Sequence, residues 1–196
     1  MNGAALAHLR AVTRQAHDAL EDSLGLLDER LSLDAYKSVL ERFYGFWRGW
    51  EPQAGALLQD EAFSGPRRRL HLLADDLAAL GTAAHALETL PLCPLTTLRD
   101  AVEALGSFYV MEGSTLGGRL IRRNVERCLG SDGRAGCSYF NGYGVETGSM
   151  WRSLLARVDA APTADAERMG RGAVATFEHL GRWLTTETRP DRSRRR

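Results

Sequence analysis

The stretch 34–58, DAYKSVLERFYGFWRGWEPQAGALL, decides the fold class of this chain. Its apolar and aromatic side chains recur at spacings of three and four, which is the period of an amphipathic helix. Ser32 stands where a helix cap is expected, and Pro52 predicts an interruption or a kink. The stretch therefore predicts one long helix with an aromatic face.

The same period extends over most of the chain. Further helices are predicted over about 6–20, 66–80, 96–129, 147–159 and 163–186, with Pro66 at a start, Gly81 at an end and a Gly/Ser/Asn-rich connection over 130–144. No alternation of apolar and polar residues is long enough to predict a strand. We expect an all-α, multi-helix domain over residues 1–186, followed by an Arg-rich, disordered tail over 187–196.

Composition predicts one soluble globular domain. The chain has 196 residues, 44% of them apolar, and 25 basic side chains balance 25 acidic ones. A formal charge of zero argues against binding nucleic acid or anionic lipid through bulk charge. Neither a membrane span nor the apolar core of a signal peptide is recognised, which predicts a cytoplasmic location. The cysteines Cys93, Cys128 and Cys137 show no CxxC spacing, so free thiols are expected.

His17 is the first candidate for chemistry. It shares a helical face with Leu9 and Leu20, so its imidazole is expected to point inward, and charged side chains fall toward other faces of the helix: Arg10, Arg14, Asp18 and Glu21. Glu21, one turn later, could accept a hydrogen bond from the ring and so orient a histidine metal ligand. The spacing is equally that of a core histidine beside an ion-pair neighbour, and both interpretations stay open.

The second candidate is YVMEGSTLGGRLIRR, residues 109–123. Gly113, Gly117 and Gly118 each cost roughly 0.8–1 kcal/mol relative to alanine inside a helix. The segment is a loop between two helices, a bent helix that lies flat against a large planar ligand, or a phosphate loop. The phosphate loop is discounted, because no strand precedes the glycines and no Gly-Lys-Ser/Thr follows them. With His17, the bent helix could sandwich an iron porphyrin.

These two segments resemble the signature segments of heme oxygenases. The likeness rests on LRAVTRQAHDALE (9–21) and YVMEGSTLGGRLIRR (109–123), in this order, and extends over most of residues 6–185, MWRSLLARVD (150–159) included. It is nearest to the bacterial branch that carries Glu-Gly-Ser in the distal helix. Members of that branch supply biliverdin to bacterial phytochromes or release iron from heme, and the resemblance implies one of these roles.

The resemblance also assigns roles to residues. It implies that His17 is the proximal iron ligand and Glu21 its partner, that the distal helix bends at Gly113, Gly117 and Gly118, and that the heme propionates are held by Arg10, Tyr109 and Arg152. Arginine suits a carboxylate because its guanidinium pairs with it in two-pronged fashion. Ser114 stands where many members have an aspartate that organises water, so the distal hydrogen bonds must differ in detail.

The implied activity opens heme b, which is both cofactor and substrate, to biliverdin, CO and ferrous iron. It uses O2 and electrons from a ferredoxin and its reductase or from a flavin reductase. The main alternative is a heme carrier or sensor that uses His17 without opening the ring. A di-iron oxidase would need Glu-x-x-His pairs, which none of the five histidines forms, and a thiamin-degrading enzyme would need a nucleophilic cysteine. Cys93-Pro94 resembles the short Cys-Pro element of heme-regulated proteins, or Pro94 is simply a proline at the start of a helix.

Overall fold

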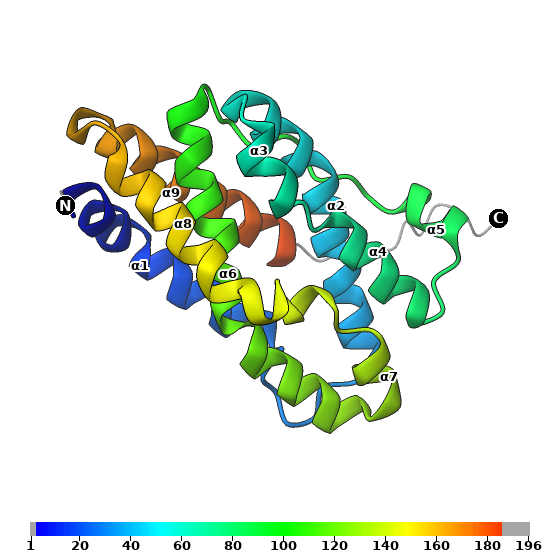
Figure 1. Cartoon of the computed structure of the whole chain (residues 1–196). Coiled ribbons are helices and arrows are strands. Elements are labelled where there is room, and N and C mark those ends of the chain that lie inside the picture. Colours follow the sequence, from blue (N-terminus) through cyan, green and yellow to red (C-terminus); the bar gives the residue numbers. More distant parts are fainter. Residues whose placement is uncertain (1–2, 186–196) are drawn as a thin grey trace.

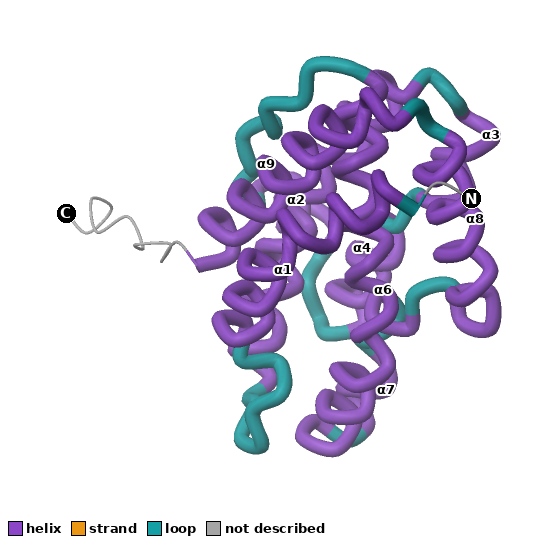
Figure 2. Tube along the Cα trace, turned by 90° about the vertical axis from the view of Figure 1, so that its left-hand side faces the viewer, coloured by secondary structure: helices purple, strands orange, loops and turns teal. Residues whose placement is uncertain are grey.

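The computed structural model describes residues 3–185, except for the side chains of residues 21–23, and all regular structure in that range is helical (Figures 1 and 2). The predicted all-α class is confirmed. The tail predicted over 187–196 lies outside the described residues, so the division into a domain and a tail stays a prediction. Within the described range, no helix is both long enough and apolar enough to cross a bilayer.

Long helices form the body of the molecule, and short helical turns connect them. The long helices are α1 (Ala4–Leu24), α2 (Leu33–Leu58), α4 (Leu70–Ala79), α6 (Ala101–Leu129), α8 (Thr147–Ala160) and α9 (Ala166–Thr185). Between them lie α3 (Glu61–Ser64), η1 (Gly65–Arg67), α5 (Ala84–Thr89), α7 (Ser131–Ala135), η2 (Tyr139–Asn141), η3 (Gly144–Glu146) and η4 (Thr163–Asp165).

The aromatic helix α2 begins as predicted and runs over the predicted range without a break. The Ser32 hydroxyl accepts a hydrogen bond from the Ala35 N–H at 3.2 Å, which confirms the cap. The interruption predicted at Pro52 does not occur, because the helix continues to Leu58. It ends where Gln59 adopts a left-handed φ of 53°.

The helix predicted over 66–80 is shorter in the structure. Pro66 belongs to η1, and α4 begins only at Leu70. The carboxylate of Glu51 on α2 accepts hydrogen bonds from the N–H groups of Arg69 at 2.7 Å and Leu70 at 3.1 Å. A side chain from another helix thus caps α4, and no local sequence signal marks this start.

The glycine-containing helix α6 is continuous from Ala101 to Leu129, so the interpretation of its glycines as a loop is wrong. It begins five residues after the predicted start, where the Asp100 carboxylate accepts hydrogen bonds from the N–H groups of Val102 and Glu103. It crosses α9 at backbone contact, since a Cβ at Gly106 would clash with the carbonyl of Met169.

The core joins α2 to α6 and α9. Trp50 packs edge-on against Trp47 at 4.9 Å and Phe108 at 5.1 Å between ring centres, and its Nε1–H donates to the Ser107 hydroxyl at 2.7 Å. Helix α9 packs against both α1 and α6. The position of α1 relative to α6 is therefore set by a shared partner, and this spacing defines the cavity described next.

Candidate active site

A cavity of about 550 Å³ lies between α1 and α6. Helices α2, α8 and α9 and the η2 turn close its remaining sides with aromatic and apolar side chains: Phe43, Phe140, Trp151, Phe177 and Leu180. Its volume falls in the range of about 300–1,000 Å³ that is typical of small-molecule sites.

The α1 wall carries one stripe of residues at spacings of three and four: Arg10, Thr13, Arg14, His17, Leu20 and Leu24. Arg10, Arg14 and Asp18, which were expected on other faces of the helix than His17, are exposed to solvent and line the cavity together with His17. Leu9, next to Arg10, is fully buried in the core. Helix α1 thus has two inward-facing sides, one packed in the core and one open to the cavity.

His17 lines the cavity, yet its side chain is 48% exposed, which differs from the inward orientation predicted for it. Its ring edge rests on Phe177 with 6.0 Å between ring centres, and its Nδ1 lies 3.6 Å from a carboxylate oxygen of Asp18. The side chain of Glu21, its predicted partner, lies outside the described residues.

The α6 wall brings two of the three predicted glycines to the cavity. Gly113 and Gly117 line it, and a Cβ at Gly113 would make only ordinary contacts with Trp151 at 3.8–3.9 Å. Gly118 does not line the cavity, since its α-carbon lies against the Phe140 carbonyl and a Cβ there would clash with that oxygen. The glycines of this segment therefore divide between cavity wall and helix packing.

Arg10 and Tyr109 meet at one end of the cavity. Burial raises the pKa of Tyr109, and the charge of Arg10 and a hydrogen bond with it oppose that rise. The structure thus brings together two of the three predicted propionate anchors. Arg152 is exposed on α8 and does not line the cavity, whereas Arg14, which the sequence interpretation passed over, does. Its position between Arg10 and His17 on the helical stripe is the signal that could have found it.

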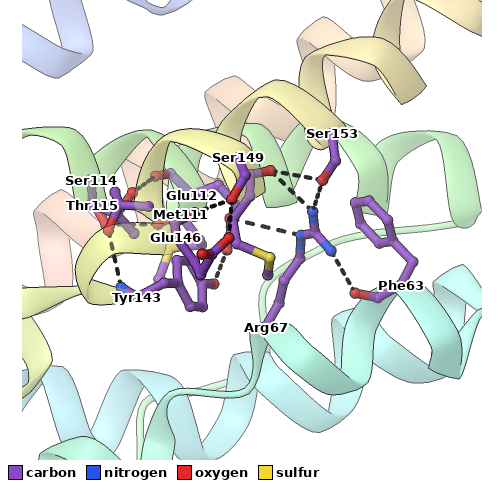
Figure 3. Close-up of polar contacts among 12 residues, drawn as sticks. Phe63, Arg67, Met111, Glu112, Ser114, Thr115, Tyr143, Glu146, Ser149 and Ser153 are labelled. Carbon is purple, nitrogen blue, oxygen red and sulfur yellow. Dashed lines mark hydrogen bonds and ion pairs between the residues drawn. The ribbon is translucent and has the colours of Figure 1, made fainter.

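A buried ionic cluster lies directly behind the cavity-lining part of α6 (Figure 3). Glu112, next to Gly113 and 2% exposed, accepts a hydrogen bond from the Tyr143 hydroxyl and lies 3.7 Å from the Arg67 guanidinium. Arg67 also donates to the Ser153 hydroxyl at 2.6 Å and to the Met150 carbonyl at 3.1 Å, both on α8. The cluster ties η1 and α8 to α6 immediately before its glycines.

The cysteines stand apart from this site. None of the three lines the cavity. Burial raises the pKa of Cys93 to about 11, and its sulfur lies 3.1 Å from the His179 ring. A thiol that is buried and protonated at neutral pH is a poor nucleophile and a poor ligand.

Comparison with known proteins decides the family. The heme oxygenase family model matches residues 4–186. The chain belongs to the heme oxygenase family. A heme oxygenase from Xanthomonas campestris pv. campestris (strain 8004) is 32% identical over 167 residues, which cover 82% of this chain and 94% of that protein. This membership confirms the resemblance and makes the chain a heme oxygenase enzyme, for which heme is substrate and cofactor.

The fold agrees with that assignment. The structure of a heme oxygenase from Leptospira interrogans superposes with a TM-score of 0.75 at 16% identity, over 94% of this chain and 99% of that one. At this identity the likeness concerns the shared all-α architecture.

Proposed function

We propose that this heme oxygenase opens heme b to biliverdin, CO and ferrous iron with O2 and external electrons, in the cavity between α1 and α6. One observation carries the proposal: a histidine on α1 and two glycines on α6, Gly113 and Gly117, line the same mainly apolar cavity. The cavity fits the group, because Gly113 and Gly117 present backbone without side chains to it, and a flat ring can approach the helix closely there.

His17 would hold the iron through its imidazole. The edge contact with Phe177 limits the rotation of the imidazole ring. The neighbouring Asp18 carboxylate favours the orientation in which Nδ1 of His17 points toward that carboxylate. A neutral imidazole pushes less electron density to the iron than a thiolate does, which disfavours O–O cleavage of the P450 kind. Heme, when bound, supplies the iron that takes up electrons and O2 and the ring that is oxidised.

The propionates would be held by Arg10 and Tyr109, with Arg14 as a further cation on the same stripe. Their guanidinium groups match carboxylates in geometry and charge. By holding the propionates, these side chains would also set the rotation of the ring in its plane and hence the biliverdin isomer that forms. Arg152 would reach a propionate only from outside the cavity wall.

The remaining walls exclude water and leave few polar groups near the reacting edge. Gly113, Gly117 and Ser114 would form the ceiling over the ring. The Glu-Gly-Ser sequence supports membership of the bacterial biliverdin-producing branch. Electrons would come from a ferredoxin and its reductase or from a flavin reductase. Biliverdin would pass to a bacterial phytochrome, or the iron would be the useful product.

The test is to titrate the purified protein with hemin and then add ascorbate or a ferredoxin reductase system in air, with catalase present to remove free peroxide. An oxygenase converts the Soret band into a bilin spectrum with equivalent loss of heme. A heme carrier or sensor keeps the Soret band through the same treatment, and that result would overturn the proposal.

A further inference from the structure

Helix α8 brings one large aromatic side chain to the cavity, that of Trp151. Trp151 begins the inward stripe of α8, because Leu154 and Val158 follow at spacings of three and four and are fully buried in the core. Trp151 itself is only half-buried, and it lines the open cavity. A tryptophan ring carries a large apolar surface, so a ring left partly uncovered on the inward side of a helix indicates a place where a further group can pack.

The position of the Trp151 ring is set by α6, beside which α8 runs (Figure 1). The ring is tilted by 40° against that of Tyr109, with 5.4 Å between ring centres. The far edge of its six-membered ring, Cη2 and Cζ3, lies 3.8–3.9 Å from the position that a Cβ would have at Gly113. The missing side chain of Gly113 thus leaves room for the indole. Tyr109, Gly113 and Trp151 together form one piece of the cavity wall.

The indole N–H of Trp151 differs from those of the other tryptophans. The other three donate their indole N–H groups to protein oxygens at 2.7–2.9 Å: Trp47, Trp50 and Trp183. Within the part of the chain that the structure describes, the Trp151 indole has no hydrogen-bond partner. Because an indole N–H usually finds a partner when the ring is covered, three tryptophans are fixed as parts of the protein framework, whereas Trp151 leaves its donor for another molecule.

The neighbouring Arg152 is oriented differently. It follows Trp151 by one residue and therefore lies roughly 100° further around the helix, where it is exposed. Its Nη1 lies 3.3 Å from the position of a Cβ at Gly148, so the guanidinium folds back along its own helix. Of these two neighbours, the tryptophan is the one that α8 presents to the cavity.

We propose that Trp151 is the contact of α8 with heme: the porphyrin packs against its indole ring beside Tyr109. The inference rests on the proposed binding of heme in this cavity. It gives a neutral aromatic side chain the part in holding the ring that the resemblance assigned to the charge of Arg152.

The experiment follows the indole N–H signals in the proton NMR spectrum while zinc protoporphyrin, a diamagnetic relative of heme with the same ring and carboxylates, is added. The chain has four tryptophans, and each signal is assigned by its loss in the matching variant, such as Trp151→Phe. The ring current of a porphyrin shifts the signals of protons close to it. The Trp151 signal is expected to move several times further than that of Trp183, which does not line the cavity. A shift no larger than that of Trp183 would overturn the inference.

Hemin affinity gives a second measurement. Trp151→Ala should raise the Kd for hemin about tenfold, as expected when roughly 50 Å² of apolar surface loses its cover. Trp151→Phe keeps part of the ring and should raise the Kd less. Arg152→Ala, from the same turn of α8, is the matched control and should leave the Kd unchanged. Equal Kd values for Trp151→Ala and Arg152→Ala would contradict the proposed contact.

The two measurements separate this inference from the proposed function on which it rests. If neither zinc protoporphyrin nor hemin binds to the wild-type protein, the proposed function is wrong, and the inference fails with it. If both bind while the Trp151 signal stays in place and Trp151→Ala binds hemin as tightly as wild type, the inference alone is wrong.

Discussion

The two walls of the cavity are built in opposite ways. On α1 the groups that would touch heme are polar and exposed: His17 is 48% exposed, and Arg10 and Arg14 also face solvent. Behind α6 the polar groups are buried and bonded to each other, with Glu112 and Tyr139 each 2% exposed. The comparison indicates that the α6 wall is rigid before heme arrives, whereas the α1 wall gains its contacts from heme itself.

The largest loss of stability is expected when the α6 wall loses the carboxylate of Glu112. Glu112→Ala removes the carboxylate that faces the buried Arg67 and accepts from Tyr143, and breaking a buried pair in this way should lower the free energy of unfolding by about 3 kcal/mol. Arg14→Ala on the exposed wall should change it by less than about 0.5 kcal/mol. Urea unfolding of both variants measures the contrast, and equal losses would remove the distinction between the walls.

The buried carboxylate of Glu112 should also make the stability of the protein depend on pH. Burial raises the pKa of Glu112 above its ordinary value of 4.5, despite the opposing Tyr143 hydrogen bond and arginine charges. The folded protein thus holds this proton more tightly than the unfolded chain, so the stability it contributes is complete below pH 4.5 and is lost as pH rises through the elevated pKa. Relative to Glu112→Gln, the wild-type protein should lose unfolding free energy as pH rises. A relative gain would mean that the pKa is lowered.

On the exposed wall the largest effect is on chemistry. His17→Ala should lower turnover by about 100-fold, because misplacing a reacting group by as little as about 1 Å can cost that much. The Soret maximum of the hemin complex should shift, and added imidazole should restore part of both properties. His85→Ala, an exposed histidine of α5, is the matched control. Normal turnover of His17→Ala without imidazole would remove His17 as the ligand.

The glycines of α6 have two different surroundings: Gly118 packs against η2, whereas Gly113 lines the cavity. Gly118→Ala should lower the unfolding free energy by about 1–3 kcal/mol, because the new methyl group would clash with the Phe140 carbonyl. Gly113→Ala meets no such obstacle, so the free energy of unfolding should rise by up to about 1 kcal/mol because alanine is favoured over glycine in a helix. The same substitution should disturb hemin binding. Thermal unfolding of the heme-free variants tests this opposition, and a loss of stability at both positions contradicts it.

The smallest effect distinguishes two arginines. Arg14→Ala should raise the Kd for hemin by about fivefold, the weight of an exposed charge pair, while Arg152→Ala should leave it unchanged. Fluorescence quenching by hemin measures both. The reverse outcome would restore Arg152 as the propionate anchor implied by the resemblance and would place Arg14 outside the site.

The sequence predicted the helices well, because capping residues and periodicity act locally. Ser32 and the aromatic run located α2, whereas the start of α4 depends on Glu51 of another helix. The helix predicted over 96–129 contains α6, but the sequence alone left open whether its three glycines form a loop. Contacts that decide this, such as Gly118 against Phe140 of η2, come from residues distant in sequence.

The site was predicted in part for a related reason. Periodicity separates polar from apolar faces, but it does not distinguish solvent from an open cavity, so it gave no sign that Arg14 lines the cavity beside Arg10 and His17. Tyr139, which also lines the cavity, escaped notice because its partners are distant in sequence: Trp47 on α2 and Asp76 on α4. Only the folded chain brings them together.

The central claim is that heme bound between these unlike walls is opened and not merely carried. Its most direct test is a single turnover of the equimolar hemin complex in air, with CO captured and the pigment separated by chromatography. We predict about one CO per heme consumed and one dominant biliverdin isomer, as expected of a ring held in a single orientation. Recovery of intact heme without CO would contradict the account.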